Sequence, residues 1–170
     1  MRRSSILAIL AVMSPIKLAE ALALRADATK KVEALRSRIV DNARYQEGEE
    51  PAEDAAALLV DAETALGELE SLIQRINRTN AATPLGEGTI TDAIARRDVL
   101  RLRHGVLTAA ADAAAGRNQG GYGRQLRSEL RYFSTLPVAE LRSSADRVAG
   151  EIRAIDVEIQ RTNWETDLLD

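Results

Sequence analysis

A heptad repeat in residues 138–159 constrains the fold of this chain more than any other sequence feature. Its apolar residues recur at intervals that alternate between three and four positions: Val138, Leu141, Ala145, Val148, Ile152, Ile155 and Ile159. This spacing places them on one face of an α-helix and favours left-handed packing against another helix. We therefore predict a helix that begins near Pro137 and packs along its length on a neighbouring helix.

Two earlier stretches carry apolar stripes with the same helical spacing. We predict a first helix over residues 14–44, with Ser14 as N-cap and Pro15 at the first helical position. A second helix should begin at Pro51 and end near Asn80, before the next proline.

The third predicted helix has Thr91 or Asp92 as its N-cap and ends at Gly116. It carries two apolar stripes, so we expect it to be buried over more than half of its circumference. The first stripe consists of Ala93, Arg97, Leu100, His104, Leu107, Ala111 and Ala114, and the second of Val99, Leu102, Val106 and Ala110.

Residues 117–136 depart from the helical pattern. They are rich in glycine, and three of the five aromatic residues of the chain lie within residues 122–133. The aromatic content favours a strand or ribbon at residues 125–135, paired with residues 88–91 or with the same strand of another subunit. The predicted fold is therefore mainly all-α: an antiparallel four-helix bundle of two helical hairpins with a short β-strand or ribbon before the last helix.

Composition limits what such a fold can do. About half of the chain is Ala, Glu, Lys, Leu or Arg, as in long amphipathic helices, and there is no Cys. Disulfides, thiolate metal sites and cysteine nucleophiles are therefore excluded. The net charge of −3 provides no overall basic character for nucleic acid, and no apolar run reaches the roughly 18 residues of a membrane helix. We expect a cytoplasmic protein without nucleic-acid or membrane contact.

The beginning of the chain allows two interpretations. Two arginines followed by an apolar run at residues 6–12 are similar to a weak signal segment, in which case the protein is exported. Alternatively Met13 is the native start, because Ser14 and Pro15 are suited to a helix N-terminus. We favour the second interpretation. Residues 1–13 are then a disordered leader or over-called start, and residues 14–170 form a single helical-bundle domain.

Residues 66–85 and 149–168 share eight identities at an offset of 83 residues. In the common core, Arg78, Thr79 and Asn80 match Arg161, Thr162 and Asn163. We interpret this match as two hairpins from a duplicated ancestor. In an antiparallel bundle the second and fourth helices finish at the same end, so both Arg-Thr-Asn segments should lie there, together with Trp164 and the start of the third helix.

The paired Arg-Thr-Asn segments are the leading candidate for a polar site. They could be helix caps, because Asn tolerates the left-handed conformation and Arg favours the negative end of a helix. They could also form a small-anion or ligand pocket, because Thr79 and Thr162 continue the inward stripes and must be satisfied there. The candidate set is Arg78, Thr79, Asn80, Arg97, Asp98, His104, Arg161, Thr162, Asn163 and Trp164.

Two members of this set lie on an inward stripe. An inward Arg97 needs a carboxylate partner. The candidates are Asp92 and Asp98 nearby, and Glu68 and Glu151 on neighbouring helices. For His104, the only histidine, we expect a hydrogen-bonded core position, because no local Ser or Cys nucleophile supports a role as general base.

Metal chemistry has little support in the sequence. With one histidine, the chain lacks the two Glu-x-x-His motifs of di-iron bundles. The acidic loop, formed by Gln46, Glu47, Glu49 and Glu50, lacks the ligand spacing of an EF-hand. We therefore expect a solvated loop, with no metal and no cofactor.

Several stretches resemble the bacterial septicolysin-like family, over about residues 16–169. They are Lys17–Leu22, Asn42–Arg44, Gln46–Pro51, Ile76–Asn80, Asp98–Leu100 and Asn163–Trp164. The resemblance implies a fold and carries over no catalytic residue. The family name implies a haemolysin. Thiol-activated cytolysins use a Cys-bearing, Trp-rich membrane loop, however, and this chain has no Cys and a single Trp.

Three functions from different classes remain open. The first is a non-enzymatic helical scaffold or interaction protein that forms a homo-oligomer and can bind a further protein partner. The second is a small-ligand or anion-binding protein, with catalysis as an option, whose site lies at the Arg-Thr-Asn end. The third, a membrane-active haemolysin-like toxin, has the least support.

Overall fold

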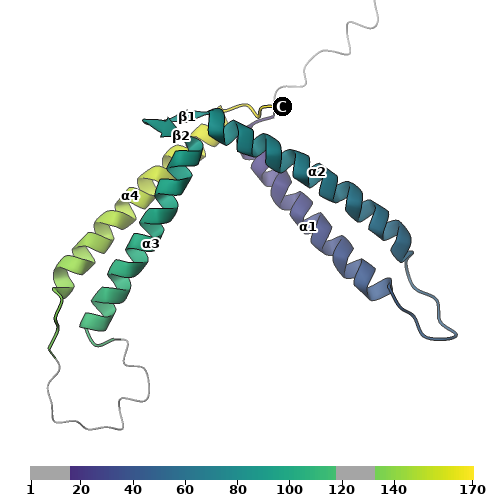
Figure 1. The fold of residues 1–170 in the computed structure, drawn as a ribbon, viewed down its shortest axis with the longest axis horizontal. Helices are drawn as coiled ribbons and strands as arrows, with labels where there is room; N and C mark the ends of the chain where they lie inside the picture. Colours follow the sequence, from purple (N-terminus) through teal and green to yellow (C-terminus); the bar gives the residue numbers. More distant parts are fainter. Residues whose placement is uncertain (1–15, 118–132) are drawn as a thin grey trace, which may run out of the picture. The chain divides into compact units, whose positions relative to one another are not determined.

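The computed structural model describes residues 16–117 and 133–170 and confirms the mainly all-α fold class (Figure 1). The helices are α1 (Leu18–Asn42), α2 (Ala55–Ala82), α3 (Ile90–Ala114) and α4 (Val138–Glu165). The short strands β1 (Pro84–Leu85) and β2 (Gly88–Thr89) form a two-stranded antiparallel ribbon between α2 and α3. The segment predicted as a strand, residues 125–135, lies largely outside the described residues.

The described residues divide into two compact units, each built around one helical hairpin. The first unit contains α1, α2 and residues Arg161–Asp170. The second contains β1, β2, α3 and α4 as far as Gln160. The prediction of a single domain from residue 14 onward stays a prediction.

The first unit buries one stripe of α1 against one stripe of α2. Leu35 meets Leu58 and Ala65 in a small apolar cluster, and partly buried side chains of both helices pack around it. These surrounding residues are Val32, Ile39 and Ala62. Other residues are buried nearer the α1 start and the α2 end: Leu18, Ala21, Ile76 and Thr79. The packed stripes agree only in part with the predicted ones, because Leu24 and Leu66, both predicted to face inward, are 50% and 43% exposed.

The predicted start of α2 at Pro51 is wrong, because the helix begins four residues later. Asp54 is the N-cap, and its carboxylate accepts hydrogen bonds from the Ala56 and Ala57 N–H groups at 2.8 and 3.3 Å. The preceding residue is held outside the helix, since the Glu53 N–H donates to Asn42 Oδ1 at 2.9 Å and its carboxylate pairs with Arg38. This ion pair lowers the pKa of Glu53 through the hydrogen bond from Arg38.

The predicted starts of α1 and α3 are also displaced. Helix α1 begins at Leu18 with Lys17 as its N-cap, whereas the predicted N-cap, Ser14, lies outside the described residues. Helix α3 begins at Ile90 with Thr89 as N-cap, two residues before the predicted Thr91. Thr89 and Asp92 form a capping box, in which each bonds the backbone N–H of the other. The ribbon places Thr89 at this position by pairing it with Pro84.

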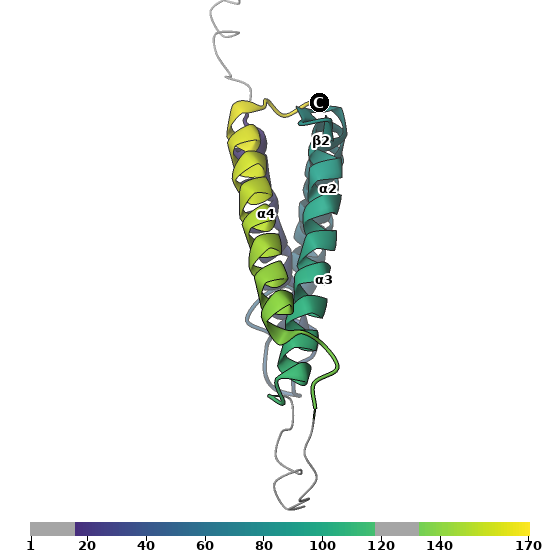
Figure 2. The same cartoon turned by 90° about the vertical axis from the view of Figure 1, so that its left-hand side faces the viewer.

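The second unit pairs α3 with the antiparallel α4 (Figures 1 and 2). Asp156 of α4 lies within 3.5 Å of Arg97 and within 3.2 Å of Arg101, both on α3. Ala145, Val148 and Ile159 of the heptad stripe are buried, whereas Ile152 and Ile155 are partly buried. The heptad stripe of α4 therefore faces inward.

In the described part of the chain, three of the four residues of the second α3 stripe are exposed, so the expectation that α3 is covered over more than half of its circumference is wrong. Val99, Leu102 and Val106 are 63%, 72% and 68% exposed. One helix partner can cover only one side of α3, and successive residues are about 100° apart around the axis. Leu102 therefore lies about 160° from the buried Leu100, on the side away from the packed stripe.

Gly67 lies in the middle of α2, and a Cβ added there would meet no atom within 4 Å. We predict that Gly67→Ala stabilises the protein by about 0.5–1 kcal/mol, because alanine loses less backbone entropy in a helix. Gly86 also has open space, but its φ of +62° disfavours a side chain, so Gly86→Ala should destabilise. Urea unfolding of both variants tests this, and equal shifts in their midpoints would contradict it.

The capping box makes helix α3 sensitive to acid. Hydrogen bonds from the Thr89 side chain and then its backbone lower the pKa of Asp92. The stabilisation from ionised Asp92 is therefore present above the unfolded pKa of about 3.9 and is lost as the pH falls through the lower folded pKa. We predict a smaller loss of stability between neutral and acidic pH in Asp92→Asn than in the unmodified protein.

The measurement is the urea midpoint as a function of pH. Asp146→Asn, at an exposed carboxylate of α4, is the control and should keep the full pH dependence. A pH dependence in Asp92→Asn that matches this control would show that the capping box does not contribute.

Candidate functional site

The two Arg-Thr-Asn segments have the inward threonines that the sequence predicts. Thr79 is fully buried and Thr162 is 8% exposed, while Arg78 and Arg161 are exposed. Both segments belong to the first unit. They also end their helices alike, since the Thr83 N–H donates to Thr79 O and the Thr166 N–H to Thr162 O, each at 2.9 Å. Both segments therefore keep regular helical hydrogen bonds near the ends of their helices.

Thr79 holds the last residues of the chain against α2. Its hydroxyl donates to Arg75 O at 2.8 Å and accepts the Leu169 N–H at 3.0 Å. The Arg75 guanidinium donates to Leu169 O and to Asp170 Oδ1, both at 3.0 Å. These contacts occupy the inward polar groups near this helix end. The cap interpretation is wrong for this segment, because α2 continues to Ala82 and its C-cap is Thr83.

A second set of bonds joins the same segment to the start of α1. The Leu18 N–H donates to Thr166 O, and the Leu168 N–H donates to Ile16 O, both at 2.9 Å. Lys17 Nζ donates to Asp167 Oδ1 at 2.6 Å. Residues 166–170 therefore bridge α1 and α2 within the first unit, a role that no sequence pattern indicated.

The remaining residues of the predicted polar site are divided between the units. Asn163 is partly buried, with its Oδ1 buried and lacking a hydrogen-bond partner in the described chain, and Trp164 is 63% exposed. Asn80 is partly buried in the first unit. Arg97, Asp98 and His104 belong to the second unit instead. The structure therefore does not assemble the ten candidates within one unit.

Arg97 has one of its predicted carboxylate partners and one that was missed. Its guanidinium contacts Asp98 at 3.0 Å, as predicted, and Asp156 of α4 at 3.5 Å. Glu68, considered as a partner, lies instead near Lys31 at 3.7 Å. His104 is partly buried on the packed stripe of α3. Arg97, Asp98 and Asp156 form an ion-pair cluster between α3 and α4. This cluster explains how a largely buried arginine is tolerated.

The acidic loop is exposed at Gln46, Glu47, Glu49 and Glu50. The Glu49 N–H donates to Gln46 O at 3.0 Å, and Gly48 has a φ of +88°, which makes the loop turn. A shallow cavity of about 460 Å³ lies beside it, lined partly by Asn42 and Tyr45. Within residues 16–117 and 133–170, no group of three or more His, Cys, Asp or Glu side chains is arranged to hold a metal ion.

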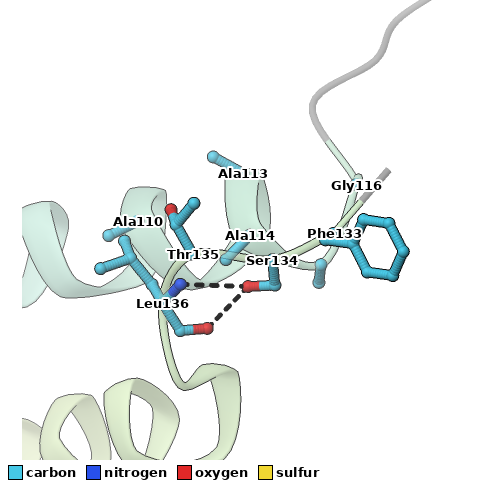
Figure 3. Close-up of a pocket in the computed structure, with 9 residues that line it drawn as sticks. Ala110, Ala113, Ala114, Gly116, Phe133, Ser134, Thr135 and Leu136 are labelled. Atoms are coloured by element: carbon cyan, nitrogen blue, oxygen red, sulfur yellow. Dashed lines mark hydrogen bonds between the residues drawn. The ribbon is translucent and has the colours of Figure 1, made fainter. Parts of the chain in front are cut away.

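Another cavity, of about 410 Å³, lies at the end of α3 (Figure 3). It is lined by Ala110, Ala113, Ala114, Ala115, Gly116, Phe133, Ser134, Thr135 and Leu136. The Ser134 hydroxyl donates to Leu136 O at 2.6 Å and accepts the Leu136 N–H at 3.3 Å, so its polar capacity is used locally. Among the described residues that line this cavity, none is charged or titratable.

The strongest candidate for an interaction site is the exposed side of α3. Six apolar residues recur there at intervals of four and three positions and are all exposed: Ala95, Val99, Leu102, Val106, Ala109 and Ala113. We call this set the α3 seam. Its spacing is that of the a and d positions of a coiled coil. Sequence reasoning found its central residues but assigned them to the core, because periodicity alone does not tell which stripe is covered.

The geometry defines a class of protein: two helical hairpins joined by a β-ribbon, with polar contacts that fix the helix ends and an uncovered apolar seam. The chain belongs to DUF6847, a family of unknown function, which matches residues 25–168. The resemblance to the septicolysin-like family stays a prediction.

A solved structure has the same fold. It is the crystal structure of a functionally unknown conserved protein from Corynebacterium diphtheriae, which is 37% identical to this chain. The alignment covers 92% of this chain and 100% of that chain, with a TM-score of 0.84. No curated protein matches the chain. In the described residues no helix is both long and apolar enough to span a membrane.

The role assigned to Thr79 can be tested by removing its hydroxyl. We predict that Thr79→Val destabilises the protein by about 1–2 kcal/mol, because the Leu169 N–H loses its acceptor at a partly buried position. The Leu169 amide should then exchange with solvent faster.

Thr64→Val is the matched control. Thr64 also donates to a backbone carbonyl in α2, that of Val60 at 3.0 Å, but it is exposed and holds no distant segment. Unfolding midpoints and hydrogen exchange should both distinguish the two variants. Unchanged exchange at Leu169 in Thr79→Val would refute the role given to this hydroxyl.

Proposed function

We propose that this chain is a non-enzymatic helical scaffold that self-associates through the α3 seam. The observation that carries the proposal is the exposure of Val99, Leu102 and Val106 on a regular helix whose other side already packs on α4. Single exposed apolar residues are common on protein surfaces, but a continuous row at coiled-coil spacing marks an interaction site.

The size of the seam sets the expected strength. Two copies would bury six large aliphatic side chains, each contributing roughly 1–2 kcal/mol from its exposed fraction. Association itself costs an estimated 4–15 kcal/mol in lost freedom and ordering. The cost offsets most of the gain, so we expect at most a weak and reversible complex, with a Kd between about 1 µM and about 1 mM.

The two hairpins have helices of matching lengths. Helices α1 and α3 each have 25 residues, and α2 and α4 each have 28. With the shared Arg-Thr-Asn segments, this equality supports the duplication inferred from sequence. With α1 and α3 aligned from their first residues, the positions in α1 that match Val99 and Leu102 are Asp27 and Lys30. Helix α1 therefore has charged residues where α3 has the centre of its seam.

The polar candidates do not favour a ligand-binding or catalytic role over a scaffold. Thr79 and Arg75 are engaged with residues 169–170, and Arg97 is engaged with two carboxylates. In the described residues these groups act as structural contacts within each unit.

The proposal predicts concentration-dependent association. Sedimentation velocity of the full chain, from about 1 µM to about 1 mM, should show a reversible shift from monomer to a larger species. Val106→Gln should weaken this association by roughly ten-fold or more, because it places an amide in the middle of the apolar seam.

Val40→Gln is the control, since Val40 is 69% exposed on α1, close to the 68% of Val106. It should leave association unchanged while matching the chemistry of the substitution. Circular dichroism should show the same helix content in both variants. A protein that stays monomeric at every concentration would refute self-association, and equal weakening by both substitutions would refute the role of the seam.

A further inference from the structure

We infer that the α3 seam pairs with the seam of a second copy as a parallel two-stranded coiled coil. The inference rests on the proposed self-association and adds the identity, number and direction of the partner helix. It is carried by the residue types along the seam and by the charges on its two borders.

The residue types favour a pair of helices over three or four. In heptad notation Val99 and Val106 occupy a positions, and Leu102 occupies the d position between them. β-branched residues at a with leucine at d favour parallel dimers over trimers and tetramers. Alanines at 95, 109 and 113 continue the seam on both sides and allow the helices to approach closely.

The charges at the seam borders select the direction. Asp98 occupies the g position before Val99, and Arg103 occupies the e position after Leu102. In a parallel pair each g residue faces the e residue five positions later in the other helix, so Asp98 of each copy faces Arg103 of the other. One pair of helices therefore gains two opposite-charge contacts.

An antiparallel pair would bring like charges together. There g residues face g residues and e residues face e residues. With Leu102 opposite Val106, Asp98 of one copy would face Asp112 of the other, and the two Arg103 side chains would face each other. The borders of the seam therefore oppose the antiparallel arrangement and support the parallel one.

Both charged side chains are accessible for these contacts. The Asp98 side chain is 57% exposed even though it also contacts Arg97 and Arg101. Arg103 is exposed and, in the part of the chain that the structure describes, has no carboxylate partner within 4.0 Å. A second copy can therefore approach the seam while the contacts between α3 and α4 stay in place.

Parallel pairing would place the β1–β2 ribbons of the two copies at the same end of the coiled coil. Both α3 helices would begin at the same end of the pair, and the β1–β2 ribbon directly precedes α3 in each copy. The dimer would therefore present two ribbons side by side.

Disulfide trapping in the full chain tests the direction, because the natural sequence has no Cys. Ala95→Cys and Ala109→Cys each place one thiol at a d position, about 21 Å apart along the helix. In a parallel dimer each variant meets the same position of its partner within disulfide range. In the antiparallel register with Leu102 opposite Val106, two copies of residue 95 would be about 27 Å apart.

We expect each variant to form a covalent dimer in most of the protein after mild oxidation. Ala154→Cys, at an exposed alanine of α4, is the control and should stay largely monomeric. If only a mixture of an Ala95→Cys and an Ala113→Cys chain cross-links, the pairing is antiparallel, and the inference fails while self-association stands. If the unmodified protein is a strict monomer by sedimentation, the proposed function fails as well.

A charge exchange gives an independent readout. Arg103→Asp should weaken association about three- to twenty-fold, because it places two acidic groups opposite each other. In the antiparallel register the same substitution exchanges an Arg103–Arg103 contact for an Asp–Asp contact and should leave the affinity nearly unchanged. The double variant Asp98→Lys with Arg103→Asp restores the two opposite-charge contacts of the parallel pair. Weakening in Arg103→Asp with recovery to within about two-fold in the double variant supports the inference, and an unchanged affinity in Arg103→Asp overturns it.

Discussion

The pairing of one apolar stripe on each helix with one neighbouring stripe is the interaction on which the rest of this structure depends. A hairpin of two helices has room to bury a single face of each, and these hairpins use stripes such as Leu35 with Leu58 in the first unit. Everything outside those stripes must be compatible with solvent or with a partner. The exposed α3 seam follows directly, because α4 already covers the other side of that helix.

Since so little of each helix is covered, the ends of the helices need additional support. Hydrogen bonds provide this support. They are the bonds of the Asp54 cap, those of the Thr89–Asp92 capping box and those from Thr79 and Arg75 to residues 169–170. Two of these contacts join segments about 90 residues apart in the chain. Residues that looked like candidates for ligand chemistry therefore serve to close the first unit.

Much of the fold could be read from periodicity. Apolar stripes predicted four helices, and the inward positions of Thr79 and Thr162 followed from their register with Ile76 and Ile159. Helix starts were less predictable, because competing caps lay within a few residues of one another. Proline is a common first helical residue, so Pro51 was a reasonable prediction. Asp54 is the N-cap instead, because Arg38 binds the Glu53 carboxylate and Asn42 accepts the Glu53 N–H, which holds Glu53 outside the helix. Those partners lie on another helix, beyond local sequence signals.

The amino-acid sequence by itself determined the helical class and the apolar stripes, because both depend only on the spacing of apolar residues along one helix. Tertiary structure alone decided which stripe of α3 is packed and which is exposed, since that depends on how many neighbours a helix has. It also decided that Asp156 pairs with Arg97 and that Leu169 bonds to Thr79. Such contacts join distant residues, and no periodic pattern in the chain specifies them.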